Sequence, residues 1–90
     1  MSVFITSDGA QFKCTFCGLA SVGILYVDLM ELTLQEALAV FGDSGRTNLL
    51  TYKTSAGETV YKNFVVILGV ERVGASIRIS LRRPYEGEEL

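Results

Sequence analysis

One segment, Thr33 to Gly42, has the pattern of an α-helix, while most of the remaining chain favours β-strands. Thr33, with Glu36 three residues later, forms a capping-box pattern, and Gly42 suits a left-handed C-cap. Apolar residues recur with the helical period along one stripe: Leu34, Ala37, Leu38 and Phe41. We therefore predict one short helix, about 34–41, which depends on packing this stripe against one face of a sheet.

Residues 3–16 form the first predicted hairpin, because two runs of β-prone residues flank the pair Asp8-Gly9. An Asp-Gly pair between such runs is among the stronger hairpin signals in a short sequence. We expect the apolar residues of both runs to share one face of the sheet. A tight turn at Asp8-Gly9 predicts two cross-strand pairs: Ile5 with Phe12, and Val3 with Cys14.

Residues 23–29 are apolar on both faces, which predicts an interior strand or one that contributes to an interface. Asp28 is the charged residue of this strand, and we expect it at the solvent-facing end or paired with an arginine. After the helix, residues 47–61 form a predicted hairpin around Ser55-Ala56-Gly57.

Residues 64–83 form the last predicted hairpin, with its turn centred on Val73-Gly74. Valine disfavours positive φ, so a loop longer than two residues is expected there. This register puts three apolar pairs on one face: Val70 with Ile77, Leu68 with Ile79, and Val66 with Leu81. It puts the following residues on the opposite face: Ile67, Glu71, Arg78 and Arg82.

These elements predict an α+β fold of mostly antiparallel sheet with one short helix on one face. Ninety residues make a single domain, 1–90, and after Pro84 the segment 84–90 is expected to be a mobile acidic tail. The strands are apolar on both faces, so they need more cover than one short helix provides. We therefore expect self-association or another protein partner on the uncovered face.

The net charge of −2 and the pI near 5.0 argue against a nucleic-acid binder, which would normally carry a basic surface. No secretory signal is visible at the start of the chain. The longest apolar run, Leu19 to Val27, is too short to cross a membrane. We expect an intracellular protein that has no membrane partner.

Cys14 and Cys17 have the C-x-x-C spacing that serves thiol exchange or supplies half of a zinc site. The chain has no histidine and no other cysteine, so one chain lacks the usual ligands for a structural zinc. Positions three apart in a strand face opposite ways. We expect two separate thiols, with Cys14 in the core and Cys17 near the strand end, and retain a small thiol-redox or zinc-binding protein as the alternative function.

The candidate partner-binding residues are mostly arginines of the last hairpin: Arg72, Arg78, Arg82 and Arg83, with Ile67 beside them. A basic patch of this kind suits an acidic protein surface or a phosphate backbone. Cross-strand pairing with Glu71 or with the acidic tail would instead make it an ordinary solvated face.

The sequence has no residues in a pattern that is typical of catalysis. There is no histidine, no nucleophile beside a base and no carboxylate pair. The loop of residues 42–46 has glycines like a phosphate-binding loop, but it follows a helix and precedes a strand, which is the reverse of the required order. We expect a protein that is not an enzyme, with no cofactor, no metal site and no small-molecule substrate.

The strings LYVDLMELTLQEALAVFGDSGRTNLLTY, VYKNFVVILGV and LRRP, within about residues 25–84, resemble small uncharacterised accessory proteins encoded by phages and prophages of Gram-positive bacteria. The resemblance implies a protein that acts through protein contacts. Its role would be in virion or tail assembly, or as an anti-CRISPR-like inhibitor of a host defence protein. It implies a location in the cytoplasm of the bacterial host or in the virion, and it assigns no functional residues.

Overall fold

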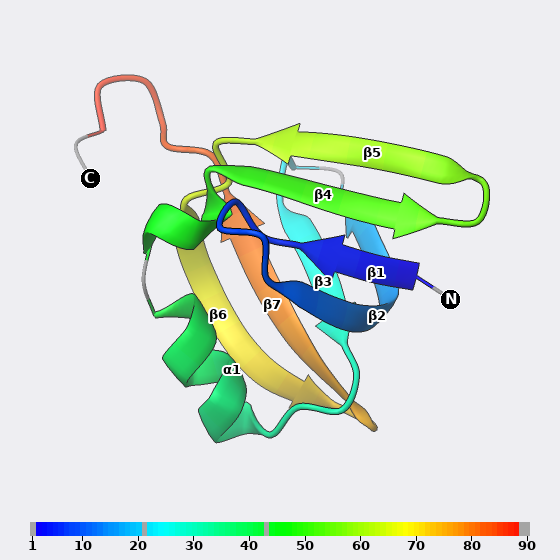
Figure 1. Cartoon of the computed structure of the whole chain (residues 1–90). Helices are drawn as coiled ribbons and strands as arrows, with labels where there is room; N and C mark the ends of the chain where they lie inside the picture. The colour runs from blue at the N-terminus through cyan, green and yellow to red at the C-terminus, as the bar shows by residue number, and fades with distance from the viewer. Residues whose placement is uncertain (1, 21, 43, 89–90) are drawn as a thin grey trace.

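A computed structural model describes residues 2–20, 22–42 and 44–88 of the chain. It contains seven strands, one α-helix and one short 3-10 helix, so the prediction of a mostly antiparallel sheet with one helix is confirmed (Figure 1). The elements are β1 (Ser2–Ile5), β2 (Gln11–Leu19), β3 (Leu25–Leu29), α1 (Leu34–Phe41), η1 (Ser44–Thr47), β4 (Leu49–Thr54), β5 (Gly57–Lys62), β6 (Val66–Val73) and β7 (Ser76–Arg82).

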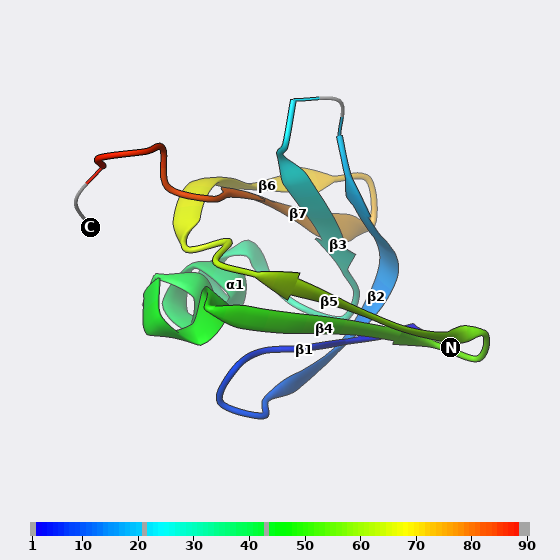
Figure 2. The same cartoon turned by 90° about the horizontal axis from the view of Figure 1, so that it is seen from above.

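All the strands belong to one sheet of order β5-β4-β1-β2-β3-β7-β6, in which neighbouring strands are antiparallel. The sheet is curled (Figure 2). The helix α1 lies along β6 at one edge, yet the ring of Phe41 on this helix is only 5.5 Å from that of Phe12 on β2. The concave side of the sheet encloses the core, and the convex side faces outward. Fully buried core side chains include Phe4, Leu25, Val27, Leu29, Leu50, Phe64, Ile79 and Leu81.

The helix begins as its sequence predicts. The amide of Glu36 donates to Thr33 Oγ1 over 3.1 Å, and the amide of Thr33 donates to the Glu36 carboxylate over 3.0 Å. The expected burial of the whole stripe is wrong in part: Ala37 and Phe41 are buried, whereas Leu34 and Leu38 are 36% and 52% exposed. The helix lies along the edge of the curled sheet, so only one flank of the stripe reaches the core.

The end of the helix also differs from the prediction. Gly42 has φ −76°, which is right-handed, so it is not the expected left-handed cap. Its lack of a side chain serves a close approach instead, because a Cβ at this position would lie 2.9 Å from the carbonyl oxygen of Leu38. Asp43, which was expected in the following loop, lies outside the described residues.

The first hairpin has a different register from the predicted one. The amide of Thr6 donates to the carbonyl of Ala10 over 3.0 Å, which closes a longer loop in which Asp8 accepts from Thr6 Oγ1. Phe4 therefore lies opposite Phe12, and Ile5 lies opposite Gln11. This shift of one residue places Phe4 in the core and turns Val3 and Ile5 to the convex side.

The last hairpin corrects two predictions. Its turn is a tight one at Gly74-Ala75, with Gly74 at φ 61°, because glycine accepts the positive φ that valine would resist. A bulge at Leu68 then puts Ile67 opposite Leu81 on the concave side. Ile67 was expected on the uncovered face; it is instead partly buried against the core. The observed pairs are Val70 with Ile79, Arg72 with Ile77, and Glu71 with Arg78.

The acidic tail contacts the sheet through Glu88. Its carboxylate accepts two bonds from the guanidinium of Arg82, at 2.7 and 2.9 Å. These bonds hold the pKa of Glu88 at about 2, and the amide of Tyr85 adds to the effect. Residues 89–90 lie outside the described residues, and the mobility of the tail stays a prediction.

Candidate functional site

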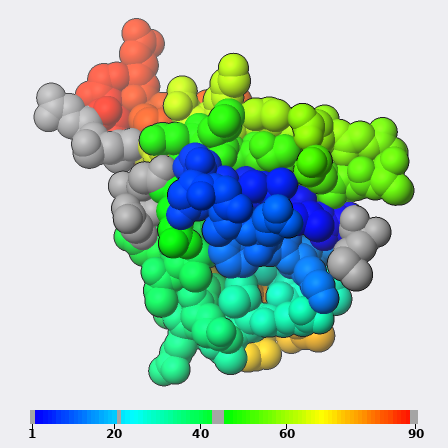
Figure 3. All heavy atoms as spheres, in the orientation of Figure 1, coloured from blue at the N-terminus to red at the C-terminus, as the bar shows by residue number. Residues whose placement is uncertain are grey.

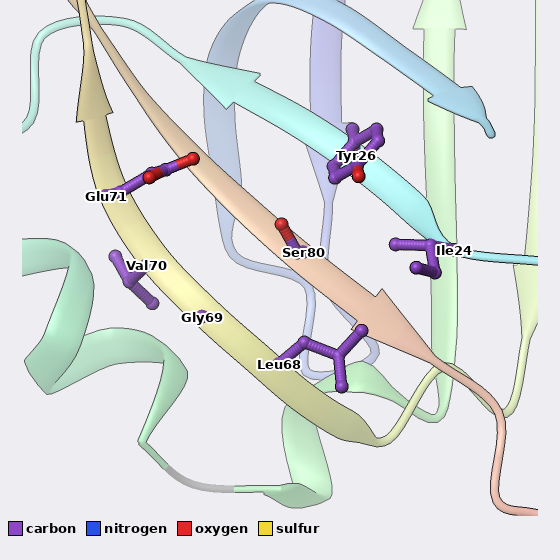
Figure 4. A pocket seen from close by; sticks show the side chains of 7 residues that line it. All are labelled: Ile24, Tyr26, Leu68, Gly69, Val70, Glu71 and Ser80. Atoms are coloured by element: carbon purple, nitrogen blue, oxygen red, sulfur yellow. The ribbon is translucent and has the colours of Figure 1, made fainter.

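The convex face of β3, β7 and β6 carries a groove, which we call the outer groove. Its first part is a hollow of about 420 Å³, and the side chains that line it are drawn in Figure 4. A second hollow of about 360 Å³ shares Ile24 and Leu68 with the first and continues towards the tail. The outer groove is thus lined by Ile24, Tyr26, Leu68, Gly69, Val70, Glu71 and Ser80, and then by Val22, Gly23, Arg82, Arg83, Pro84 and Tyr85.

Small residues create the floor of the groove. Tyr26 on β3 lies opposite Ser80 on β7, and Ser80 lies opposite Gly69 on β6. A Cβ at Gly69 would meet no atom within 4 Å, so the space above this glycine is open. Leu68, the extra residue of the bulge, borders this space at 47% exposure. The groove results from the small residues of β7 and β6 beside the larger side chains of Tyr26 and Leu68.

Exposed apolar surface continues beyond the floor of the groove. Val22 is 75% exposed and Tyr85 is 69% exposed, and both line the second hollow. Side chains this apolar are usually buried when the fold provides cover. In the described part of the chain, α1 covers the concave side, so this convex surface has no such cover.

An ion pair next to the groove fixes one of its walls. The guanidinium of Arg78 donates to both carboxylate oxygens of Asp28, at 2.7 and 3.0 Å, which confirms the expected pairing of Asp28 with an arginine. The same guanidinium carbon lies 5.1 Å from the centre of the Tyr26 ring. The bonds to Asp28 raise the pKa of Arg78 above its usual value. Arg78 is therefore engaged within the sheet and supports Tyr26 from the side.

We expect Arg78→Gln to lower the free energy of unfolding by about 2 kcal/mol, because it leaves the largely buried carboxylate of Asp28 without its charged partner. Urea denaturation followed by circular dichroism measures this change. Lys13→Gln is the matched control, since the Lys13–Glu31 pair is well exposed at both ends and its loss should cost less than about 0.5 kcal/mol. Equal losses in the two variants would contradict this role for the Asp28–Arg78 pair.

The predicted partner-binding residues do not form one patch. Arg82 and Arg83 line the second hollow, but Arg82 pairs with Glu88, and Arg83 donates to the carbonyl of Lys62 over 2.8 Å. Arg72 lies in the concave-side row opposite Ile77, and Ile67 is also on that side. The residues that sequence reasoning missed are Ile24, Tyr26, Leu68, Gly69 and Ser80. The glycine within the run VVILGV was the available signal, since a glycine inside a strand often marks a bulge.

Cys14 and Cys17 lie on the same face of β2, so the prediction of opposite faces was wrong. A bulge between Cys14 and Phe16 adds one residue to the strand and brings both thiols to the concave side. Both side chains are buried, and burial raises the pKa of Cys14 to about 11 and that of Cys17 to about 12. Such thiols are protonated at neutral pH and are weak nucleophiles.

Comparisons with protein-family models, with curated proteins and with solved structures give no match for this chain. Within the described residues, no three cysteine, histidine or carboxylate side chains gather closely enough to hold a metal ion. The helices in the same residues are all too short to span a membrane.

Proposed function

We propose that this protein is a non-enzymatic interaction module, and that its outer groove receives an extended apolar segment of a partner protein. The observation that carries the proposal is the exposed, hollowed apolar surface formed by Ile24, Leu68 and Tyr85 on the uncovered side of the sheet. Exposed surfaces of this kind commonly serve protein contacts. A protein segment that covered it would remove the side chains of Leu68 and Tyr85 from water.

The polar groups of the groove suit recognition better than catalysis. Tyr26, Ser80 and Glu71 line the first hollow. In the described part of the chain, neither hydroxyl is hydrogen-bonded to a base that would activate it as a nucleophile. The nearby Arg78 and Arg82 are held in ion pairs. These groups can accept and donate hydrogen bonds to a peptide backbone, which fixes the direction and register of a bound segment.

The biological setting that we propose is a phage or prophage of a Gram-positive bacterium, with the protein in the host cytoplasm or in the virion. The pattern within residues 25–84 supports this setting. Two roles fit an interaction module there: a component of virion or tail assembly, or an inhibitor of a host defence protein. The alternative use of Cys14 and Cys17 in redox or zinc chemistry is disfavoured by their burial and raised pKa values.

Leu68→Asp should weaken partner capture, because Leu68 borders both hollows and a carboxylate there would have to be desolvated on binding. The measurement is affinity capture by the immobilised protein from lysates of phage-infected Gram-positive cells, followed by titration of the purified partner. We expect at least about a tenfold weaker Kd, as for loss of a central apolar contact.

Leu38→Asp is the matched control, since Leu38 is 52% exposed on α1 and lies outside the groove. It should bind as the unmodified protein does, with thermal unfolding used to confirm that both variants are folded. If no protein is captured, or if Leu68→Asp binds as tightly as Leu38→Asp, the proposal fails.

A further inference from the structure

The strand β5 is an unprotected edge of the sheet. It pairs with β4 without a break, from the pair of Thr54 with Gly57 to the pair of Leu49 with Lys62. Its other side has no neighbouring strand in the described chain. Five of its six residues are exposed. The tip of the β4–β5 hairpin projects beyond the body of the molecule (Figure 3). Regular, projecting edges of this kind readily pair with another strand.

The opposite edge of the sheet is protected. The strand β6 carries the bulge at Leu68, which interrupts its ladder, and α1 lies alongside it. Bulges and covering helices are two of the ways in which proteins block edge-to-edge pairing. The strand β5 has no bulge and no proline. Of the two edges, β5 is therefore the one that is available for pairing.

The free hydrogen-bonding groups of β5 belong to alternate residues. The amide of Asn63 donates to the carbonyl of Asn48 over 2.8 Å, so Asn63 faces β4. Because backbone groups alternate in direction along an antiparallel strand, Tyr61 and Thr59 also face β4. The amides and carbonyls that point away from β4 are those of Glu58, Val60 and Lys62, and the Lys62 carbonyl accepts from Arg83 Nε over 2.8 Å.

We propose that β5 pairs antiparallel with β5 of a second copy of this chain, across a twofold axis at Val60. In this register Val60 lies opposite Val60 of the other copy, and Glu58 lies opposite Lys62 on both sides of the axis. The backbone groups of Glu58 and Val60 that point to this edge have no partner in the described chain, and the Lys62 carbonyl, which accepts from Arg83 Nε, has a second lone pair. Each pair can therefore exchange two hydrogen bonds. Two sheets join into one continuous sheet, and the isologous contact closes as a dimer.

Charge complementarity selects both the partner and the register. Charged side chains on an edge normally deter pairing. Here Glu58 and Lys62 have opposite signs and lie at equal distances from Val60, so antiparallel self-pairing makes both contacts attractive. A shift by two residues, the smallest that keeps the free groups facing each other, would place a charged residue opposite Val60. On the other face, Tyr61 lies opposite Thr59, which is a favourable cross-strand pair.

The proposed dimer leaves the outer groove free. The groove is built on β3, β7 and β6, whereas β5 is at the other end of the strand order. Arg83 contacts both surfaces, since it lines the second hollow and donates to the Lys62 carbonyl, but no residue of β5 lines the groove. Failure of self-pairing would leave the proposed partner binding in the groove intact, and the converse also holds.

Val60→Pro tests the pairing of the backbone. The amide of Val60 points to the free edge, so proline removes both hydrogen bonds of the Val60–Val60 pair in the dimer without removing one of the β4–β5 ladder. Sedimentation equilibrium of the full chain should show a dimer, and Val60→Pro should be monomeric at the same concentration. Val60→Thr keeps the amide and a β-branched side chain, and it should remain a dimer. A monomeric unmodified chain at roughly 1 mM, or a Val60→Pro variant that still dimerises, would overturn the proposal.

A charge exchange tests the register. Lys62→Glu and Glu58→Lys each bring like charges together twice in a homodimer, so each should dimerise at least about tenfold more weakly than the unmodified chain. Mixed together, the two variants pair opposite charges at both positions and should form a heterodimer. If the mixture associates no better than either variant alone, the Val60-centred register is wrong.

Discussion

Replacing Phe41 with alanine should lower the free energy of unfolding by about 3–5 kcal/mol, as expected for removal of a fully buried aromatic ring. Phe41 is 1% exposed, and its ring lies 5.5 Å from that of Phe12. It anchors α1 to β2, whereas the rest of the helix lies along β6. A domain of this size has a total stability on the order of 5–15 kcal/mol, so the variant should be only marginally folded.

Leu38→Ala on the same helix is the control for Phe41→Ala. Leu38 is 52% exposed, so its truncation should change the free energy of unfolding by less than about 0.5 kcal/mol. Urea denaturation of both variants, followed by circular dichroism, measures the difference. A loss in Leu38→Ala as large as that in Phe41→Ala would mean that the whole apolar stripe is packed, contrary to the structure.

The helix and the existence of the strands could be predicted from the sequence because their signals are local. The capping box of Thr33 and Glu36 lies within one turn, and it fixed the start of α1 at the observed residue. The strand order could not be predicted in this way. The contact of Phe12 with Phe41 depends on how far the whole sheet curls, and no local pattern records that curl.

The predicted registers of the first and last hairpins were wrong for a related reason. A single additional residue reverses the faces of a strand, so the longer loop after Thr6 moved Phe4 into the core, and the bulge at Leu68 moved Ile67 to the concave side. Bulges leave little trace in apolar sequences such as VVILGV, where every residue suits either face.

The candidate site was located only in part. The sequence pointed to an uncovered face of the last hairpin, and Arg82 and Arg83 do line the groove. Tyr26 and Ser80 could not be placed there without the pairing of β3 with β7, which brings together segments far apart in the chain. The predicted arginine cluster does not exist as one patch, because Arg78 pairs with Asp28 and Arg82 pairs with Glu88.

Both thiols of the folded protein should react very slowly with a disulfide reagent at pH 8. Burial raises the pKa of Cys14 to about 11 and that of Cys17 to about 12, from the ordinary thiol value of 9.0. Each pH unit is a factor of ten in the thiolate fraction, so we expect labelling roughly 100-fold slower for Cys14 and roughly 1,000-fold slower for Cys17 than for an exposed cysteine. Both thiols should react at once in guanidinium. Rapid labelling in the native state, or zinc bound by the purified protein, would favour the thiol-redox or zinc-binding alternative.

The same pKa values predict how stability depends on pH. The raised pKa of each thiol favours the folded state while the thiol is protonated, so this contribution is complete below pH 9 and is lost as the pH rises towards 11 and 12. The free energy of unfolding should fall by up to about 1.4 kcal/mol per pH unit for each thiol in this range. Cys17→Ala should weaken the decline more than Cys14→Ala, because the shift of Cys17 is larger. The pKa of Tyr61 is also raised, by burial and then by Cys17, so Cys17→Ala reduces that shift as well and weakens the alkaline decline further. Identical alkaline declines in the two variants and the unmodified chain would show that neither thiol is buried as described.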